Sequence, residues 1–360
     1  MKNNNFLPRL FFSLFISSTA FFFSACDPDP APATPKGAYQ KGIFILNEGS
    51  FRAGNSAVSF YNRNSKTVDA DIFAGVNNRP LGDVAQSITQ HNDQSYLVIN
   101  NSNKIEIVEA NTFAEIHTIN NLALPRYLAV ANNKAYVTEY VNFTGNGQVS
   151  VIDLNNHTVV KKIAVGKLPE NLLAVNNKLF VVNSGENSVS VINTDTDVVE
   201  KTLTLADSPN SLVLDANNKI WVLAGGKKVY NPDFSVDATN STPGTLIRLN
   251  PSTQVVELSL PFTSRTSSPT RLITNGAKNK LHYQYGGKIY QFDITAAALP
   301  TAPLINRSFY GLGIDPTTNT IYGGDAGFFT SAGKVVRFNP NGSAIDSFTV
   351  GIAPNGFLFR

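Results

Sequence analysis

The chain has 360 residues, of which 42% are hydrophobic and 15% are charged, so it can bury a large core. Its formal charge is only +3, and no run of five like charges occurs. The clustered lysines and arginines that neutralise nucleic-acid phosphates are missing, and we expect no nucleic-acid partner.

The first twenty-five residues predict an export signal. Two basic residues, Lys2 and Arg9, precede an apolar run at residues 10–23, which is followed by the small pair Ser24-Ala25. This order is typical of a secretory signal peptide. The apolar run is shorter than the roughly 20 residues of a transmembrane helix. We therefore predict that residues 1–25 are removed during export.

The only cysteine, Cys26, lies at the expected cleavage point. The segment Phe23-Ser24-Ala25-Cys26 resembles a bacterial lipobox, with Phe23 in place of the usual leucine. The resemblance implies that Cys26 is lipidated and anchors the protein in a membrane; the alternative is an ordinary signal peptide with an incidental cysteine. With Cys26 acylated, disulfides and cysteine chemistry are excluded from the mature domain. Residues 26–41 then form a tether, because the alternating prolines favour an extended chain.

From residue 42 onward the pattern is all-β, because short alternating or β-branched runs are separated by Asn, Gly, Asp and Pro. In the clearest copies of a repeated unit, a strand follows a proline and leads through Asn-Asn-Lys into a second strand. Repeats of about 40–45 residues with four short strands are typical of β-propeller blades. The longest unit carries an insertion at residues 225–244. The units begin near Asp83, Pro125, Pro169, Pro209, Pro269, Phe309 and Pro354.

The two ends of the chain predict the number of blades. Residues 42–47 match a second strand, whereas residues 354–360 match only a first strand. Joining them completes one blade and leaves no open sheet edge at the seam. We therefore predict a seven-bladed β-propeller over residues 42–360, closed by the C-terminal strand joining the N-terminal blade.

Two groups of residues resemble known families. Units with Val149-Ser150-Val151-Ile152-Asp153 and Leu179-Phe180-Val181-Val182-Asn183 resemble the YVTN-repeat, YncE-like propellers, which are bacterial surface or periplasmic binding domains. The opening Gly42-Ile43-Phe44-Ile45-Leu46-Asn47-Glu48-Gly49 resembles Bacteroidetes outer-membrane lipoprotein propellers, some of which pass cobalamin to a TonB-dependent transporter. The resemblance covers the mature domain. It implies a lipoprotein of the outer membrane, at the cell surface, that captures a small molecule such as a corrinoid.

In a propeller, the loops entering the first strands and the loops between second and third strands emerge on one face. Their aromatic rings, amides and mixed charges suit a large polar ligand or a protein partner. The alternative is that they shape turns and line a water-filled channel. The first set of loops contributes Arg79, Asp83, Arg126, Tyr127, Glu170, Asn171, Asn210, Arg271, Tyr310 and Asn355. The second set contributes Asn47, Glu48, Phe51, Arg52, Glu139, Tyr140, Asn183, Tyr230, Phe234, Tyr285, Asp325, Phe328 and Phe329.

Catalytic motifs are missing from the sequence. The four histidines show no HxH, HxxxH or HExxH spacing, and no GxSxG motif occurs, so we expect neither an enzyme nor a metal or cofactor site. One alternative is a propeller lactonase or lyase, in which Glu48, Glu139, Glu170 and Asp325 would converge on Ca²⁺. We expect these carboxylates to pair with Arg79, Arg126 or Arg271 instead. We favour ligand capture for a transporter over a scaffold that binds an envelope protein or a glycan.

Overall fold

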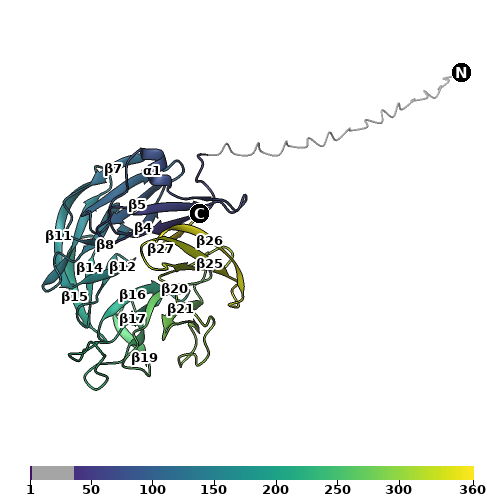
Figure 1. The fold of residues 1–360 in the computed structure, drawn as a ribbon. Helices are drawn as coiled ribbons and strands as arrows, with labels where there is room; N and C mark the ends of the chain where they lie inside the picture. The colour runs from purple at the N-terminus through teal and green to yellow at the C-terminus, as the bar shows by residue number, and fades with distance from the viewer. Residues whose placement is uncertain (2–35) are drawn as a thin grey trace. The chain divides into compact units, whose positions relative to one another are not determined.

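The computed structural model describes Met1 and residues 36–360. Residues Lys36–Arg360 form one compact unit, in which seven small antiparallel sheets are arranged in a ring (Figure 1). The prediction of a seven-bladed β-propeller is thereby confirmed. The predicted signal peptide, the lipidation of Cys26 and residues 26–35 of the tether lie outside the described residues. None of the helical segments in this described part has the length and apolar character that crossing a bilayer demands.

Within each blade, the antiparallel strands follow one another from the axis outward. The first three blades contain β27 (Pro354–Phe359), β1 (Ile43–Asn47), β2 (Ala57–Tyr61) and β3 (Val68–Asp69); β4 (Ala85–His91), β5 (Gln94–Ile99), β6 (Lys104–Glu109) and β7 (Glu115–Ile119); and β8 (Pro125–Ala131), β9 (Lys134–Glu139), β10 (Asn146–Asp153) and β11 (Thr158–Lys167). A short helix, α1 (Ile72–Asn77), follows β3.

The remaining four blades complete the ring. They contain β12 (Pro169–Val175), β13 (Lys178–Asn183), β14 (Ser188–Asn193) and β15 (Val198–Thr204); β16 (Pro209–Leu214), β17 (Ile220–Ala224), β18 (Thr245–Asn250) and β19 (Val255–Pro261); β20 (Thr270–Thr274), β21 (Lys280–Tyr285) and β22 (Lys288–Asp293); and β23 (Gly311–Ile314), β24 (Ile321–Asp325), β25 (Ala332–Phe338) and β26 (Ala344–Ile352).

The C-terminal strand closes the ring, as predicted. Strand β27 pairs antiparallel with β1, with Phe359 opposite Ile43 and Phe357 opposite Ile45. It also contacts the innermost strands of both neighbouring blades, β23 and β4. In Figure 1 the yellow C-terminal strands therefore lie beside the purple N-terminal ones. The two ends of the chain thus form one sheet, and no edge of β1 is left unpaired.

Asparagine pairs form two of the two-residue hairpins. At residues 132–133 and 176–177 both central residues have φ between 50° and 57°, which is the left-handed conformation that a two-residue type I′ turn requires. The third copy differs, since among its two asparagines only Asn218 has a positive φ. There the Asp215 carboxylate accepts hydrogen bonds from Lys219 N and Trp221 Nε1, both at 2.8 Å. This longer turn is stabilised by a side chain as well as by the backbone.

A glycine at the start of some third strands leaves room for the proline that opens the next blade. A Cβ on Gly147 would lie only 2.3 Å from Cδ of Pro169 and 2.6 Å from the carbonyl oxygen of Glu139. A side chain at this position would therefore push β12 away from its place at the axis. The same contact recurs in two further blades, between Gly244 and Pro269 and between Gly333 and Pro354.

The hydrophobic core lies between neighbouring blades. One cluster joins Tyr136 and Val149 of the third blade to Val181 and Ile192 of the fourth, and all four side chains are fully buried. Strand β1 is buried at all five positions, since blades cover both of its faces. This packing fixes the innermost strands, whose starting residues point toward the axis.

The sixth blade departs from the predicted pattern of four strands, and that expectation is wrong there. Only β20, β21 and β22 form its sheet. Beside β22, where a fourth strand would lie, the chain forms only an isolated antiparallel bridge between Ile289 and Ile305. The segment that should supply the fourth strand contains Pro300 and Pro303, which cannot donate the backbone hydrogen bonds of a ladder.

Residues 36–41, which the sequence placed in the tether, lie against the propeller. The Tyr39 ring packs edge-on against Phe60, with ring centroids 5.1 Å apart, and its backbone N–H donates to Asn111 O at 2.9 Å. Lys36 forms an exposed ion pair with Asp93 at 3.1 Å. The compact unit therefore begins a few residues before position 42.

Candidate functional site at the propeller axis

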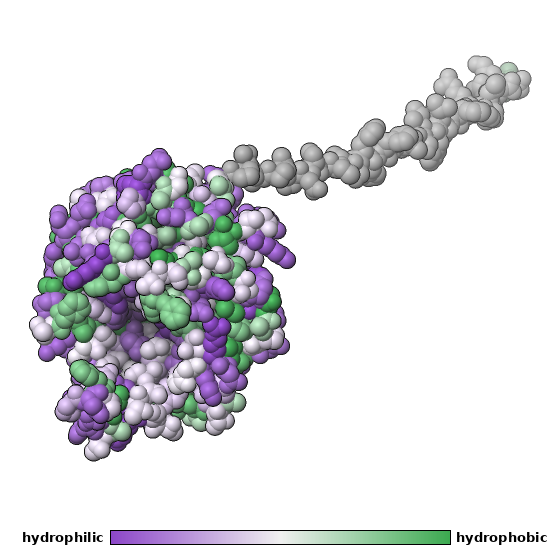
Figure 2. Space-filling view, in the orientation of Figure 1, coloured by the Kyte–Doolittle hydropathy of each residue, from purple (hydrophilic) through white to green (hydrophobic). Residues whose placement is uncertain are grey.

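An open cavity of about 500 Å³ lies where the innermost strands of the blades converge. The space-filling view shows it as a hollow near the centre of the face turned toward the viewer (Figure 2). Its volume lies within the range of about 300–1,000 Å³ that is usual for pockets that bind small organic molecules. We call it the axial cavity.

Each of the seven blades contributes one side chain from the same repeat position to the wall of the axial cavity. In six blades this position directly follows the proline or phenylalanine that opens the repeat, and in the second blade it follows Ala85, the first residue of β4. The side chain at this position points toward the axis. Two of the amides also join neighbouring blades, since Asn210 donates to Pro269 O at 3.1 Å and Asn355 donates to Ala85 O at 2.9 Å. We call these residues the axial ring: Gln86, Arg126, Glu170, Asn210, Thr270, Tyr310 and Asn355.

Nine of the residues predicted from the sequence, besides Phe51, line the axial cavity. The sequence placed most of them in loops, but seven lie within the first residues of the innermost strands, whereas Tyr310 directly precedes β23 and Glu48 directly follows β1. The set is Glu48, Arg126, Tyr127, Glu170, Asn171, Asn210, Arg271, Tyr310 and Asn355. The cavity also includes Phe51, which the sequence placed on this face.

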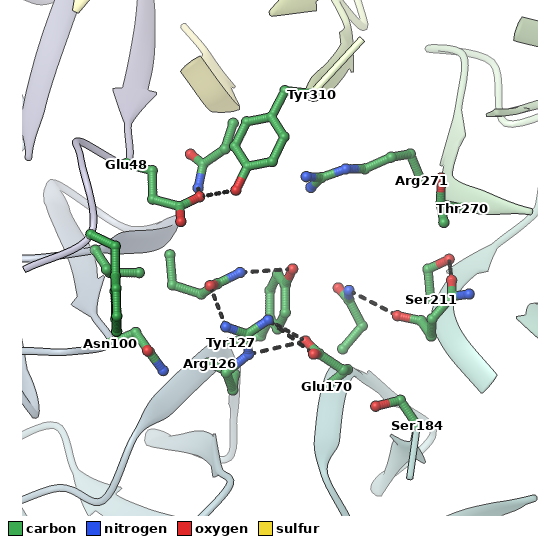
Figure 3. Close-up of a pocket in the computed structure, with 16 residues that line it drawn as sticks. Glu48, Asn100, Arg126, Tyr127, Glu170, Ser184, Ser211, Thr270, Arg271 and Tyr310 are labelled. Carbon is green, nitrogen blue, oxygen red and sulfur yellow. Dashed lines mark hydrogen bonds and ion pairs between the residues drawn. The ribbon is translucent and has the colours of Figure 1, made fainter. Parts of the chain in front are cut away.

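Arg126 and Glu170 form an ion pair across two neighbouring blades (Figure 3). The Arg126 NH2 group donates to Glu170 Oε1 at 2.9 Å, and Nε donates to Oε2 at 3.2 Å. The Tyr140 hydroxyl donates to Glu170, and the Tyr140 ring lies 4.7 Å from the guanidinium. The Arg126 NH1 group also donates to Gln86. Tyr140 therefore supports the cavity wall without lining it.

Burial governs the protonation of this pair. It raises the pKa of Glu170, and the positive charge of Arg126 offsets part of that rise. For Arg126, burial acts to lower the pKa, but Glu170 outweighs it and the pKa is raised. Arg126 therefore stays charged, and its guanidinium is already bound by Glu170 and Gln86, two residues of the same wall.

Glu48 is bound on the opposite wall by two members of the axial ring. The Tyr310 hydroxyl donates to Glu48 Oε2, and Asn355 Nδ2 donates to the same oxygen at 3.3 Å. Burial and then the hydrogen bond to Glu48 raise the pKa of Tyr310, so its hydroxyl remains a neutral donor. The ring of Phe329 packs edge-on against Tyr310, with centroids 4.8 Å apart.

Arg271 stands in the wall without such a partner. Its guanidinium lies 5.5 Å from the centroid of the Tyr310 ring. Among the residues that the structure describes, no carboxylate lies within ion-pair distance of Arg271 and no side-chain hydrogen bond involves its guanidinium (Figure 3). The axial cavity thus presents one cationic group that the fold does not neutralise by direct contact.

The remaining predicted residues lie outside the axial cavity. Arg79 pairs with Glu106 and Glu115 at 2.8 Å each, and Asp83 accepts from the Arg52 backbone at 3.0 Å. These contacts stabilise strands and loops around the second blade.

Two further predicted residues are buried at the ends of second strands. Glu139 accepts hydrogen bonds from Ala123 N at 2.5 Å and Gln148 Nε2 at 3.2 Å. Asn183 donates to Ser188 at 2.8 Å and Ser190 at 3.0 Å. Glu139 thus binds the connection before β8 and strand β10, Asn183 binds strand β14, and neither side chain lines the axial cavity.

The last four occupy other surfaces. Tyr230 and Phe234 lie on the insertion and are 62% and 88% exposed. Tyr285 packs against Phe262, with ring centroids 4.5 Å apart, beside a separate apolar pocket of about 470 Å³. Asp325 pairs with Arg307.

Of the four carboxylates considered as calcium ligands, Glu48 and Glu170 line the axial cavity, whereas Glu139 and Asp325 bind partners outside it. In the described part of the chain, no group of three or more His, Cys, Asp or Glu residues is placed to hold a metal ion. Of the arginine pairs expected for these four carboxylates, only Glu170 with Arg126 occurs; Asp325 pairs with Arg307 instead.

Two members of the axial ring, Gln86 and Thr270, were not predicted from the sequence. Their repeat units are more diverged, and neither residue carries a charge or an aromatic ring. The signal that identifies them is position, because Thr270 follows Pro269, which opens its repeat, and Gln86 is the second residue of the first strand in its blade. Asn100, Ser184 and Ser211 also line the cavity and were missed.

Comparison with solved structures supports the fold. A quinonprotein alcohol dehydrogenase-like protein from Bacteroides thetaiotaomicron is similar with a TM-score of 0.68 and 16% identity over 89% of this chain and 78% of that chain. The periplasmic gluconolactonase of Pseudomonas aeruginosa is similar with a TM-score of 0.62 and 10% identity over 88% of this chain and 99% of that chain. At these identities the similarity shows the fold alone.

Sequence comparison identifies the family. No curated protein matches the chain, and the resemblance to YVTN-repeat and cobalamin-binding propellers stays a prediction. A family model matches residues 41–359, which is nearly the whole described unit. The chain therefore belongs to the family described as Domain of unknown function (DUF5074).

Proposed function

We propose that the protein is a non-catalytic binding module that holds an organic ligand in its axial cavity. The observation that carries this proposal is the axial ring, in which every blade presents one side chain to an open cavity of about 500 Å³. Most of these side chains are polar groups that the fold does not need for its apolar core. A few well-placed polar groups in a preformed concavity are typical of small-molecule sites.

Exposed aromatic rings beside the cavity support the same proposal. Phe51 lines the cavity and is 67% exposed, and Phe328 and Phe329 are 88% and 44% exposed. The Ser50 hydroxyl donates to Phe329 O at 2.7 Å and ties the two loops together. Such rings provide flat apolar surface for a ligand or a partner.

A more specific proposal concerns where the protein is located and which protein receives its ligand. The protein would be anchored through Cys26 to the outer membrane at the cell surface, and would pass its ligand to a TonB-dependent transporter. A corrinoid is the leading candidate ligand, on the basis of the N-terminal sequence resemblance. Because a corrinoid is larger than the axial cavity, only its peripheral groups would enter, and its ring system would rest near Phe51 and Phe328.

A second candidate function is an interaction scaffold for another envelope protein or a glycan. Three exposed aromatic side chains outside the cavity favour it, since Phe143, Tyr230 and Phe234 are 71%, 62% and 88% exposed. The lactonase or lyase alternative has no comparable support among the described residues, because the carboxylates that it requires bind other partners.

The test uses a substitution that fills the axial cavity. The purified protein is titrated in a calorimeter with cyanocobalamin, with neutral sugars (glucose and maltose) and with sugar acids (gluconate and galacturonate). We expect at least one compound to bind, and we expect Thr270→Trp to abolish that binding, because Thr270 belongs to the axial ring. The control is Thr196→Trp, since Thr196 lies in an exposed turn between β14 and β15. Equal affinity of Thr270→Trp and wild type would contradict the proposal.

A further inference from the structure

Arg271 is the group in the axial cavity that most directly indicates a ligand. The other charged side chains of the wall have direct partners: Arg126 with Glu170, and Glu48 with Tyr310 and Asn355. Arg271 has only the Tyr310 ring, 5.5 Å away. In Figure 3 its guanidinium points across the cavity toward Tyr310, and no interaction is drawn from it. Glu170 acts on Arg271 only through space. A half-buried charge without a counterion in direct contact is costly, and an anion entering the cavity would lower that cost.

The backbone at Arg271 is also unusual. In five other blades the residue with positive φ lies just before the first strand, at Val84, Leu124, Leu168, Ser208 and Ala353. In the sixth blade it is Arg271 itself, with φ of 60°, inside β20 and next to a shift in strand register. Left-handed backbone at a residue other than glycine is strained, and such strain is enriched at functional sites.

A buried acceptor lies in the same wall. Asn355 is only 6% exposed, and its Oδ1 atom has no hydrogen-bond partner among the described residues. Its Nδ2 group already donates to Ala85 O at 2.9 Å and to Glu48 at 3.3 Å, so the side-chain orientation is fixed. A buried acceptor of this kind is normally satisfied by a donor, so the site also calls for an O–H or N–H group.

We propose that the axial cavity binds a hydroxylated organic acid. Its oxyanion accepts hydrogen bonds from the Arg271 guanidinium, and one of its hydroxyl groups donates to Asn355 Oδ1. The planar guanidinium matches a carboxylate or a phosphate in a two-bond contact. This inference rests on the proposed function and names the class of ligand that the cavity takes.

The test compares an acid with its neutral counterpart. Calorimetric titrations of the purified protein use gluconate, galacturonate and glucose 6-phosphate as acids, with galacturonic acid methyl ester and glucose as neutral counterparts. We expect at least one acid to bind more than about tenfold more tightly than its counterpart, since a charged hydrogen bond contributes about 1.5–3 kcal/mol. The two sugar acids and the phosphate distinguish a carboxylate ligand from a phosphate ligand.

Variants of Arg271 test the role of its guanidinium. Arg271→Gln should weaken acid binding about 10- to 100-fold, whereas Arg271→Lys should restore part of it, because an ammonium keeps the charge but loses the fork geometry. Arg265→Gln is the matched control, since Arg265 contacts the insertion through Thr239 O and Ser241 O and does not line the cavity. Circular dichroism and the melting temperature verify that each variant is folded.

The outcomes separate this inference from the proposed function. Neutral compounds that bind as tightly as the acids, or an Arg271→Gln variant with unchanged affinity, would overturn the inference. If the Thr270→Trp variant nevertheless bound none of these compounds, the proposal that the axial cavity is a binding site would stand. If no acid of the panel bound the wild-type protein, the inference would be wrong; if no neutral compound and no cyanocobalamin bound either, the proposed function would fail with it.

Discussion

Buried polar side chains are the residues whose chemistry the fold changes most. His282, on β21, is only 3% exposed, and the Gln291 amide donates to its Nε2 atom at 2.9 Å. Burial, and then the nearby charge of Lys280, lowers the pKa of His282 to about 4. The folded protein therefore holds this imidazole in its neutral form at neutral pH.

The shifted pKa of His282 predicts a pH dependence of stability. In the unfolded chain the imidazole takes up a proton near its ordinary pKa of 6.5. Below that pH the unfolded state binds the additional proton, so the free energy of unfolding should fall as the pH decreases from about 6.5 to about 4. The loss should total on the order of 3 kcal/mol. Urea denaturation of wild type and His282→Gln at a series of pH values measures it.

The control for this experiment is His91→Gln, which replaces a half-buried histidine at the end of β4. His91→Gln should retain the loss of stability at acidic pH, whereas His282→Gln should lose it. Parallel pH profiles for His282→Gln and wild type would show that His282 does not carry this dependence.

Repeat position predicted site residues better than side-chain chemistry did. Arg126, Glu170 and Asn355 follow the proline that opens a repeat, and all three line the cavity. Glu139 and Asp325 have equally suitable chemistry, yet Glu139 accepts a hydrogen bond from Ala123 N and Asp325 pairs with Arg307. The conformation of each loop decides these partners, and spacing in the sequence does not reveal it.

At the scale of strands, the contact between glycine and proline sets the position of the innermost strands. Gly147→Ala places a Cβ 2.3 Å from Pro169 Cδ and 2.6 Å from a backbone oxygen, so the neighbouring strand must move. We expect this substitution to lower the free energy of unfolding by about 1–3 kcal/mol. Urea denaturation at a fixed pH measures the change.

Gly75→Ala is the matched control for Gly147→Ala. Gly75 lies in α1, and a Cβ there meets no atom within 4 Å. Alanine is favoured over glycine in helices by about 0.5–1 kcal/mol, so this variant should be as stable as wild type or more stable. If Gly147→Ala were no less stable than Gly75→Ala, the packing account of these glycines would be wrong.

Strands could be predicted where local chemistry determines them. The asparagine pairs at residues 132–133 and 176–177 form the two-residue turns that asparagine favours, and the strands beside them are where the sequence placed them. The sequence predicted four strands in every blade, and the absence of the fourth strand from the sixth blade was not foreseen. The regular spacing of the repeats outweighed the local signal of Pro300 and Pro303. Tertiary contacts, including the bridge from Ile289 to Ile305, hold that segment instead.

At the scale of the whole molecule, the fold could be predicted and the ligand could not. Repeats and matching chain ends determine a closed ring of blades, and hundreds of residues contribute to that signal. The ligand depends on a few side chains at the axis, among them Arg271 and Asn355. Proteins described as an alcohol dehydrogenase-like protein and a gluconolactonase have similar folds at 16% and 10% identity, so the fold alone does not determine what is bound.

Closure of the ring by β27 creates the axial cavity, because this strand contacts both neighbouring innermost strands and carries Asn355. Deleting residues 354–360 would expose the edge of β1 and remove Phe357 and Phe359 from their packing against Tyr322. Deleting residues 230–236 removes seven residues as well, but from the exposed insertion, and serves as the control.

The most direct test is therefore the thermal unfolding of these two deletion variants, followed by circular dichroism. We expect the protein without residues 354–360 to lose its cooperative transition or to melt at least about 10 °C below the full chain. The protein without residues 230–236 should melt close to the full chain. A chain without residues 354–360 that melts at the same temperature as the intact protein would contradict the closed ring and the binding site built on it.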